Sequence, residues 1–472
     1  MLDAGGAVGR SVVQVPSGYM VIAEAVVPGN LGKPFAIHFD ANGAFMDETQ
    51  HYSTTAHDYN HGYSDAAWNN GPTALTALTA FQAGNFSWSQ MSLVRYGADG
   101  DTVWTRTLLD TGYVGGRQTC LLPDDRFAVC GFNDPDETSG SALLVVGDTL
   151  NGVHWTKSFT STTEALGVRP CGAHGLVYSG YQLGGVDNPV WVMRLDSIGD
   201  VIWRRDIGGS RYVGTNVSAL QTQDGGIVAA CSYMPLPGGP FNMQWNYFRK
   251  WDIDGNVMWT KQYNQQYWAF SYDMEELDDG SLVASGYELS LQGGGIRRGL
   301  LYKLEPDGDL TWLRKYNYYS GQASNHIPYD VEPTSDGGFA MTGVAQQGTD
   351  DSIPNLEMVW LLKVDSMGCL VPGCGWDGME EVALGLENAL SVYPNPAHGT
   401  VTVSAALPAD LVVRGILSLV LVDGLGRTVR NEQVGRGFSS TALDLSGLPQ
   451  GVYHLHLRDE GRWLSGVKVV VD

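Results

Sequence analysis

A short pattern recurs seven times before residue 371 of this chain, and it constrains the fold more than any other sequence feature. The pattern is an alternating apolar segment, an acidic residue, two further residues and a glycine, usually with a tryptophan four residues after the glycine, and some copies match it weakly. The repeated glycines lie 47 to 60 residues apart, at Gly43, Gly100, Gly152, Gly199, Gly255, Gly308 and Gly368. This spacing indicates a repeat architecture in which each period is one structural unit.

The residue types in each copy predict a β-hairpin. The acidic side chain can accept hydrogen bonds from the turn backbone, the glycine tolerates a positive φ, and the tryptophan opens the next strand with a large apolar surface. The two residues before the acid are basic and then apolar, as in a strand with one buried face. These pairs are Arg194 and Leu195, Lys250 and Trp251, Lys303 and Leu304, and Lys363 and Val364.

A second turn pattern, centred on Asp-Gly, lies between these hairpins. It is clearest at Asp224-Gly-Gly226, Asp279-Gly280 and Asp336-Gly337. Each period therefore carries two hairpins, which are the four strands of a propeller blade. A β-solenoid has a shorter period and a row of separate sandwiches needs nearly twice the length per unit. We therefore predict a β-propeller of about seven blades.

The last copy lacks its tryptophan strand, because the chain turns to Cys369 and Pro372 after Gly368. Two alternatives remain open: either the N-terminal segment completes that blade, or the ring closes imperfectly. Over residues 1–371 the repeats resemble those of bacterial secreted propellers of the delta-60 or kelch-like kind. This resemblance implies the fold and specifies no ligand.

The sequence changes character after residue 371. Residues 372–388 are rich in glycine and acidic residues, and we interpret them as a linker. Residues 389–472 alternate strands with turns, enough for about six or seven strands in a small immunoglobulin-like β-sandwich. The predicted fold class is therefore all-β, with a propeller at 1–371, a linker at 372–388 and a sandwich at 389–472.

Four motifs in the C-terminal segment follow the order of one known family, and the segment closely resembles the type A sorting domain of the type IX secretion system. They are Tyr393-Pro-Asn-Pro396, Asp423-Gly-Leu-Gly-Arg427, Leu448-Pro-Gln-Gly-Val-Tyr453 and Lys468-Val-Val-Val471. The alternative is an ordinary carbohydrate-binding or fibronectin-III-like sandwich. The residues that carry the resemblance are Tyr393, Pro394, Asn395, Pro396, Asp423, Gly424, Gly426, Arg427, Gly451, Tyr453 and Lys468.

This resemblance implies export across the outer membrane by the type IX secretion machinery. It further implies cleavage in the linker between residues 373 and 389, followed by release or attachment to surface lipopolysaccharide. We therefore expect a secreted or cell-surface protein. Residues 1–6 show neither the basic nor the apolar region of a signal peptide, so we expect that this start is truncated or trimmed.

The charge, hydropathy and cysteines of the chain limit the binding partners and the disulfide bonds that we expect. A net charge of -23 repels phosphate backbones, so we expect no nucleic-acid partner. No apolar run approaches the roughly 18 residues of a transmembrane helix. Cys369 and Cys374 have a spacing that can close a small disulfide loop. We interpret the other four cysteines as buried thiols; they are Cys120, Cys130, Cys171 and Cys231.

Few residues suggest local chemistry. His51, His57, Asp58 and His61 gather in an insertion between the first two blades, where we favour a polar rim loop over a metal site. The turns Asp252–Gly255 and Asp307–Asp309 resemble fragments of calcium loops but lack the closing glutamate, and turn capping explains them better. The sequence contains no Gly-x-Ser-x-Gly nucleophile motif, no His-Glu-x-x-His zinc motif and no phosphate-binding loop. We therefore nominate no catalytic residue, metal or cofactor.

Nine aromatic residues fall partly in loops, where exposed rings can stack on sugars. We predict a propeller that binds a glycan or protein ligand. The alternatives are an exported propeller enzyme acting on polysaccharide or peptide, favoured by convergent carboxylates at the central channel, and a structural surface-layer component. The aromatic residues are Trp68, Trp88, Trp245, Tyr247, Tyr267, Trp268, Tyr316, Tyr318 and Tyr319.

Overall fold

The structure, a computed structural model of the whole chain, contains strands and no helix in the part of the chain that it describes. In that part, no helix is long and apolar enough to cross a membrane. The described residues are 6–27, 30–41, 43–50, 59–61, 67–68, 73–82, 85–110, 112–134, 140–159, 164–182, 188–210, 217–233, 244–264, 268–290, 295–319, 323–348, 357–370, 389–407, 417–422, 428–435, 438–459 and 462–472.

Among the described residues, the repeat region forms seven antiparallel sheets, and consecutive strands are neighbours except at β5 and β6 of sheet 2. Sheet 1 holds β1 (Gly6–Val15), β2 (Gly18–Val27), β3 (Asn30–Asp40) and β4 (Phe45–Gln50). Sheet 2 holds β5 (Tyr59–His61) and β6 (Ala67–Trp68), which both pair with β7 (Thr73–Gln82), then β8 (Asn85–Gly97) and β9 (Thr102–Leu109). Sheet 3 holds β10 (Val114–Leu122), β11 (Arg126–Asn133), β12 (Ser141–Asp148) and β13 (Gly152–Phe159).

The remaining sheets continue this order. Sheet 4 holds β14 (Glu164–Cys171), β15 (Gly175–Tyr181), β16 (Asn188–Leu195) and β17 (Val201–Ser210). Sheet 5 holds β18 (Val217–Gln221), β19 (Ile227–Tyr233), β20 (Trp245–Trp251) and β21 (Val257–Tyr263). Sheet 6 holds β22 (Trp268–Glu276), β23 (Leu282–Ser290), β24 (Ile296–Leu304) and β25 (Leu310–Tyr316), and sheet 7 holds β26 (Asn325–Pro333), β27 (Phe339–Gln346) and β28 (Glu357–Val364).

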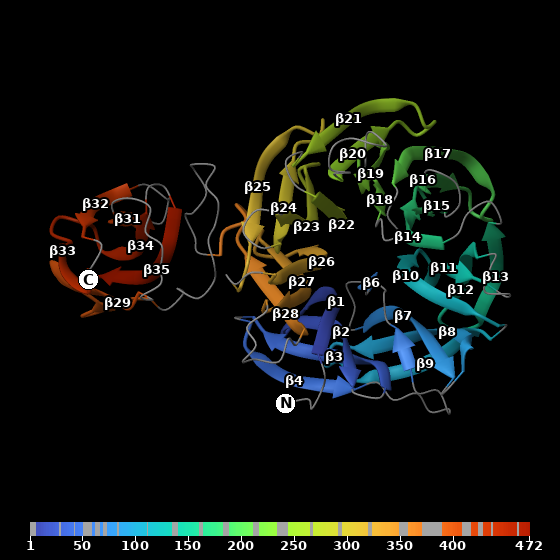
Figure 1. Cartoon of the computed structure of the whole chain (residues 1–472), viewed down its shortest axis with the longest axis horizontal. Coiled ribbons are helices and arrows are strands. Elements are labelled where there is room, and N and C mark those ends of the chain that lie inside the picture. The colour runs from blue at the N-terminus through green and yellow to red at the C-terminus, as the bar shows by residue number, and fades with distance from the viewer. Residues whose placement is uncertain are drawn as a thin grey trace. The chain divides into compact units, whose positions relative to one another are not determined.

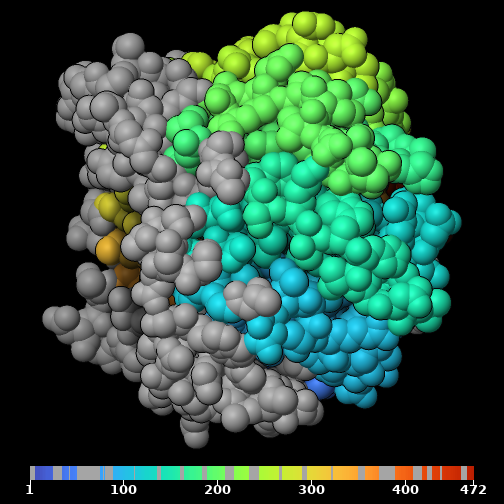
Figure 2. Space-filling view, turned by 90° about the vertical axis from the view of Figure 1, so that its right-hand side faces the viewer, coloured from blue at the N-terminus to red at the C-terminus, as the bar shows by residue number. Residues whose placement is uncertain are grey.

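The sheets are arranged around an axis with their first strands innermost, which is the architecture of a β-propeller (Figure 1). On the side of the molecule shown in Figure 2, the visible sheets form successive bands in sequence order from blue to yellow-green. The all-β, about seven-bladed prediction is confirmed. The described residues divide into two compact units, and the smaller one joins residues 363–472 with the short segments 313–320 and 335–339.

The turn chemistry that the repeat predicts is present in every copy. All seven repeat glycines have φ between 72° and 86°. In the clearest copy, Oδ1 of Asp252 accepts hydrogen bonds from the backbone N–H groups of Asp254 and Asn256, at 3.0 and 2.8 Å. The fragments that resemble calcium loops are therefore capped turns. The described residues contain no cluster of metal-binding side chains.

Sheet 7 has three strands among the described residues, and β1 pairs with β2 in its own sheet. The alternative in which the N-terminal segment completes the last blade is therefore not observed in the described part of the chain. Sheets 7 and 1 instead meet through side chains. Ala340 of β27 belongs to the apolar cluster that contains Val12, Val21 and Phe35 of sheet 1.

The C-terminal segment forms two sheets around a common apolar core. One contains β29 (Leu390–Tyr393), β30 (Thr400–Ala405) and β33 (Ser440–Asp444). The other contains β32 (Thr428–Val434), β31 (Leu417–Val422), β34 (Gly451–Asp459) and β35 (Arg462–Val471), in that order. The seven strands match the expected count, while the immunoglobulin-like assignment stays a prediction.

The cysteines divide as the sequence suggests. Cys120, Cys130, Cys171 and Cys231 are buried free thiols. Cys369 is disulfide-bonded. Cys374 lies outside the described residues, so its pairing with Cys369 stays a prediction. Burial raises the pKa of Cys120 and of Cys231 to about 12, which keeps both thiols protonated and unreactive.

Candidate functional site

A β-bulge recurs in the first strand of four sheets and leaves one residue without a register partner in three of them and two, Tyr272 and Asp273, in β22. The pairing register shifts around Arg10 in β1, Arg117 in β10, Leu166 in β14 and Tyr272 in β22. A bulged residue is released from the strict alternation of a strand, so its side chain can point in a direction that the regular pleat does not allow. Because the first strands are innermost, this column lies around the propeller axis (Figure 1).

Four aromatic rings form a continuous cluster at this level, which we call the axial aromatic cluster. The rings of Phe270 and Tyr287 stack at 4.5 Å with an interplanar angle of 9°, and Tyr272 lies 5.9 Å from Tyr287. Tyr272 of sheet 6 also meets Tyr329 of sheet 7 edge to face at 4.8 Å. Tyr287 is buried, whereas the other three rings keep part of their surface exposed.

Two guanidinium groups flank the axial aromatic cluster. Cζ of Arg10 lies 5.2 Å from the centroid of the Tyr329 ring, and its Nη2 forms an ion pair with buried Glu24 at 3.2 Å. Nη1 of Arg297 donates to Oδ1 of Asn325 at 2.6 Å. Arginine beside aromatic faces is favourable because the ring face carries partial negative charge. The cluster therefore combines apolar ring faces with several hydrogen-bond donors.

The tyrosine hydroxyls of the cluster stay protonated. Burial raises the pKa of Tyr272 well above its ordinary value, and the neighbouring tyrosines raise it further. Burial also raises the pKa of Tyr287 to about 12, although Arg297 opposes the shift. Both hydroxyls therefore remain neutral groups that donate and accept hydrogen bonds across the physiological pH range.

A polar network lies near the axis, where Arg169 of β14 meets two carboxylates that follow Tyr272 in β22. Nη2 of Arg169 in β14 contacts Oδ1 of Asp273 at 3.1 Å and Oε1 of Glu275 at 2.8 Å, both in β22. These contacts join sheets 4 and 6 past sheet 5, which only side chains near the axis can do. Ser218 of the intervening sheet 5 also donates to Asp273, at 3.1 Å.

Asp273 belongs to a second recurring device that links neighbouring sheets. Its Oδ2 accepts the backbone N–H of Val331 in the next sheet, at 3.4 Å. In the same way, Oε1 of Gln118 accepts the N–H of Val168 at 2.7 Å. Asp330 accepts the N–H of Val12 at 2.6 Å, which joins sheet 7 to sheet 1. These inter-sheet bonds are structural, because each satisfies a buried backbone donor.

Glu275 is the axial carboxylate with the most perturbed chemistry. Burial raises its pKa to about 7, the charge of Asp273 adds to the shift, and Arg169 opposes it. Its side chain keeps 23% of its surface exposed, against 4% for Asp273. Glu275 can therefore exchange protons near neutral pH, while Asp273 is committed to the contacts between sheets.

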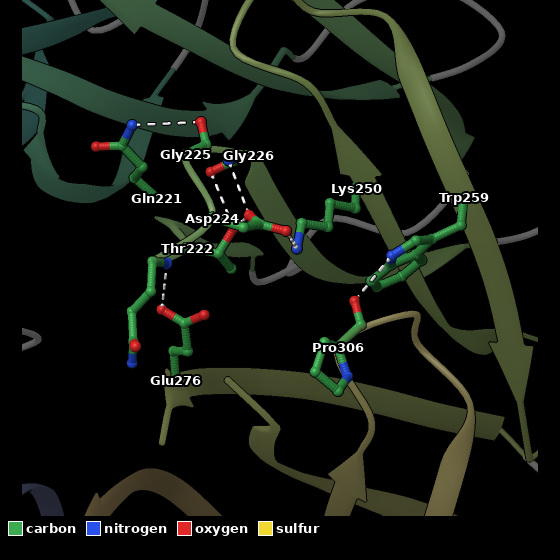
Figure 3. Close-up of polar contacts among 10 residues, drawn as sticks. Gln221, Thr222, Asp224, Gly225, Gly226, Lys250, Trp259, Glu276 and Pro306 are labelled. Carbon is green, nitrogen blue, oxygen red and sulfur yellow. Dashed lines mark hydrogen bonds and ion pairs between the residues drawn. The ribbon is translucent and has the colours of Figure 1, made fainter. Parts of the chain in front are cut away.

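A third set of contacts lies at the turns of sheet 5, where Asp224 bonds Lys250 at 2.7 Å and the N–H of Gly226 at 3.0 Å (Figure 3). Burial opposes ionisation of Asp224, but the hydrogen bonds from Lys250 and Thr222 outweigh it and lower its pKa to about 2. Asp279 with Lys303 and Asp336 with Lys363 repeat the ion pair. The pair stabilises the repeat and offers no free group for a ligand.

The residues singled out in the sequence do not form this site. Tyr59–His61 is a short strand, β5, that pairs with β7 rather than a rim loop, whereas His51, His57 and Asp58 lie outside the described residues. Among the nine aromatics, Tyr247 and Tyr316 are 3% and 1% exposed and belong to the interior. The side chains of Trp68, Trp88 and Tyr267 are not described.

Sequence reasoning missed Phe270, Tyr272, Tyr287 and Tyr329. The first strands have no contiguous motif comparable with the acid-Gly-Trp column, so their bulged position is not marked within a single repeat. Alignment of the residues just before each Asp-Gly turn places Tyr272 and Tyr329 in one column. That alignment is the signal that could have found them.

Among the described residues, the first, third and fourth sorting motifs meet at the C-terminal strand. Asn395 donates from Nδ2 to the carbonyl of Lys468 at 2.8 Å and accepts the N–H of Val470 at 2.8 Å, so the first and fourth motifs meet. The third motif pairs with the same strand, because Gly451 lies opposite Val471. Asp423, Gly424, Gly426 and Arg427 lie outside the described residues.

Tyr453 of the third motif is 5% exposed and its hydroxyl donates to the carbonyl of Pro449 at 2.8 Å. This hydrogen bond fixes the start of β34 to the turn just before it. Tyr393, by contrast, is 80% exposed, and Lys468 is also exposed. The motifs thus contribute both to the core and to the surface of this unit.

Residues 391–472 match the family model of a secretion system C-terminal sorting domain. The match confirms the sorting domain that the four motifs predict. The sorting domain indicates a secreted or cell-surface protein. No curated protein is significantly similar to the chain in sequence.

Several solved structures resemble the chain at low identity. A puromycin hydrolase is 14% identical with a TM-score of 0.49, over 86% of this chain and 61% of the hydrolase. The periplasmic gluconolactonase of Pseudomonas aeruginosa is 12% identical with a TM-score of 0.43, over 76% and 96%. Regucalcin from Agrobacterium tumefaciens is 10% identical with a TM-score of 0.36, over 64% and 88%. Likenesses at this level carry no argument about activity.

Proposed function

We propose that this chain is a binding protein exported by the type IX secretion machinery. Residues 389–472 direct the propeller across the outer membrane, and cleavage within residues 372–388 then releases it or attaches it to surface lipopolysaccharide. The propeller of residues 1–371 binds a glycan or protein ligand outside the cell. The observation that carries this proposal is the sorting-domain match at residues 391–472.

The arrangement of the sorting motifs supports the proposal. Asn395 satisfies one N–H and one C=O of β35, and the neighbouring Ala397 donates to the carbonyl of Val470 at 2.8 Å. Without these bonds the outer edge of β35 would present free backbone groups. Asn395 therefore holds the C-terminal strand in one conformation, which a receptor for this end of the chain requires.

An exported hydrolase is less well supported than a binding protein. Convergent carboxylates do occur at the axis, at Asp273 and Glu275. A carboxylate pair that cleaves a glycosidic bond needs both groups free to contact the substrate. Asp273 is bonded to Ser218, Arg169 and the N–H of Val331, and Glu275 is paired with Arg169, so neither carboxylate has that freedom.

The test follows the mass and location of the protein in cells with and without residues 389–472. The full-length protein should reach the medium or the cell surface and lose its C-terminal segment between residues 373 and 389. The deletion variant should accumulate in the periplasm. Equal location and mass for both forms would contradict the sorting role.

Point variants separate recognition from bulk truncation. Asn395→Ala removes both bonds to β35 and should lower the secreted fraction by about thirtyfold, since two lost bonds of about 1 kcal/mol each weaken the ordering of the strand. Ser391→Ala, on the exposed face of β29, is the matched control and should be secreted normally.

A further inference from the structure

In sheets 4 to 7, the turn that contains the repeat glycine is held by the outermost strand of the preceding sheet; we call it the repeat turn. Nε1 of Trp259 in β21 donates to the carbonyl of Pro306 in the repeat turn of sheet 6, at 3.1 Å (Figure 3). Lys157 of β13 pairs with Asp200 in the repeat turn of sheet 4. The repeat turns of sheets 5 and 7 accept equivalent hydrogen bonds from Arg205 and Arg314. Sheets 3 to 6 therefore each cover the repeat turn of the next sheet with side chains of their last strand.

The side chains that hold these turns belong to a short pattern, a tryptophan followed two residues later by lysine or arginine. Residues two apart lie on the same face of a strand, so both side chains can reach the same turn. Only five of the 14 tryptophans of the chain are followed in this way, and all five lie in outermost strands. They are Trp104 with Arg106, Trp155 with Lys157, Trp203 with Arg205, Trp259 with Lys261, and Trp312 with Arg314. The pattern is therefore typical of the strand that covers the next repeat turn.

The repeat turn of sheet 1, at residues 40–44, lacks this cover. Sheet 7 precedes sheet 1 in the ring, and its last strand among the described residues is the third, β28. Gly43 is exposed, whereas Gly152 is half-buried and the other five repeat glycines are buried. The one sheet with three described strands thus precedes the one exposed repeat glycine.

The edge of β28 differs from the edges of the other sheets. Leu361, three residues before the end of β28, is half-buried. The equivalent residues of third strands that have a fourth strand beside them, Val192 in β16 and Leu301 in β24, are 0% exposed. Residues 358–362 of β28 are all apolar, whereas the outermost strands of sheets 2 to 6 each carry a central lysine or arginine. Charges protect sheet edges from pairing, so β28 has the composition of a strand that accepts a partner.

We infer that the edge of β28 and the repeat turn of sheet 1 form a docking site for an extended segment of a partner protein. The segment pairs with β28 as a fourth strand, and its tryptophan and cation lie over the turn at Gly43. This inference rests on the proposed binding function and names the ligand as a peptide with the pattern tryptophan, any residue, lysine or arginine. Backbone hydrogen bonds to a sheet edge give such complexes affinity, and side chains at alternate positions give them specificity.

Charge and sequence indicate that the segment comes from another protein. The net charge of -23 favours a segment that carries a cation. The five tryptophan and cation pairs of this chain already belong to β9, β13, β17, β21 and β25. Residues 1–5 contain no aromatic residue, lysine or arginine, and residues 371–388 contain no lysine or arginine. Neither sequence that flanks the described propeller strands therefore has the side chains that the site fits.

The test titrates the full chain into a fluorescein-labelled peptide with the sequence of residues 257–263, Val-Met-Trp-Thr-Lys-Gln-Tyr, and follows the fluorescence anisotropy. The peptide should bind saturably. Trp259→Ala or Lys261→Glu within the peptide should each weaken binding about tenfold, because each removes one of the two contacts with the turn. A peptide of the same composition in scrambled order, without the two-residue spacing, is the control and should bind no better than either variant.

Variants of the chain test the edge itself. Val359→Lys places a charge on the edge of β28 and should weaken peptide binding about tenfold. Val103→Lys, the matched control, makes the same change at a 55% exposed position of β9, the outermost strand of sheet 2, and should bind like the unaltered protein. In the unaltered protein, the peptide should slow hydrogen exchange in β28 and at residues 40–46, which locates the site even if Val359→Lys fails to fold.

Absence of saturable binding, protection of other strands only, or equal binding by Val359→Lys at an unchanged unfolding temperature overturns the inference. If the chain is exported and processed normally in that case, the export function stands and only the ligand class fails. Loss of export with retained peptide binding would instead contradict the export function and support the ligand class.

Discussion

The carboxyl group of Glu275 shows how a position near the axis changes one side chain. Burial and the charge of Asp273 raise its pKa to about 7, from 4.5 in an ordinary environment. A carboxyl whose folded-state pKa is raised favours folding fully below the unfolded pKa, and this contribution disappears as pH rises through the folded pKa. The window for Glu275 is therefore about pH 4.5 to 7.

Glu275→Gln should remove this pH dependence. Between pH 5 and pH 8 the unaltered protein should lose on the order of 2 kcal/mol of stability relative to the variant, because only it ionises a buried carboxyl. Urea unfolding at both pH values measures the difference. Asp254→Asn, at an exposed turn, is the control and should track the unaltered protein. A variant with the same pH profile as the unaltered protein would refute the assignment.

At the scale of the element, the outermost strand of one sheet holds the turn of the next. Nε1 of Trp259 in β21 donates to the carbonyl of Pro306 at 3.1 Å (Figure 3). The hydroxyl of Tyr263 donates to the carbonyl of Gly308 at 2.6 Å, and Lys261 pairs with Asp309. The repeat tryptophan therefore acts between consecutive sheets as well as within its own.

Two separate requirements explain why residue 308 in this turn is a glycine. Its φ is +83°, and a Cβ there would lie 2.8 Å from the Trp259 ring. The sequence predicts only the first of these requirements, because the turn is local. The second comes from a residue of the preceding repeat and is visible only once the sheets are packed.

Tyr263→Phe should destabilise the propeller by about 1 kcal/mol, because it removes one hydrogen bond and leaves the ring in place. The carbonyl of Gly308 then loses its partner at the junction of sheets 5 and 6. Thermal unfolding measures the loss. Tyr318→Phe changes a 46% exposed tyrosine and should have no effect. If both variants unfold alike, the contact between sheets contributes nothing.

For the whole molecule, ring closure depends on the junction of sheets 7 and 1. No strand from the N-terminal segment joins sheet 7 within the described residues, so closure relies on apolar packing and on Asp330. Asp330 is 5% exposed and accepts the N–H of Val12 at 2.6 Å.

Asp330→Ala should cost about 2 to 3 kcal/mol, the value of a hydrogen bond to a charged group, and should open the ring locally. Hydrogen exchange should accelerate in β1, β2 and β26. Gln118→Ala removes the equivalent bond inside the ring and should accelerate exchange in β10 and β14 instead. Identical exchange maps for the two variants would show that the closure point is not special.

The sequence by itself determined the local geometry. The seven positive-φ glycines, the capped acidic turns and two hairpins per period follow from interactions within a few residues, so the blade could be predicted from them. The sorting domain was also readable, because four ordered motifs occur within one short segment. The residues that form each signal are contiguous in the chain, so both signals can be recognised in a single sequence.

Only the tertiary structure decided the axial site and the closure of the ring. Arg169 lies 104 positions from Asp273, and Asp330 lies 318 positions from Val12, so neither pair leaves a pattern that a reader of the sequence can see. Tyr272 and Tyr329 look like ordinary strand tyrosines until the first strands converge on the axis. The physical reason is that a propeller brings together side chains one from each repeat, at a spacing set by the ring and not by the sequence.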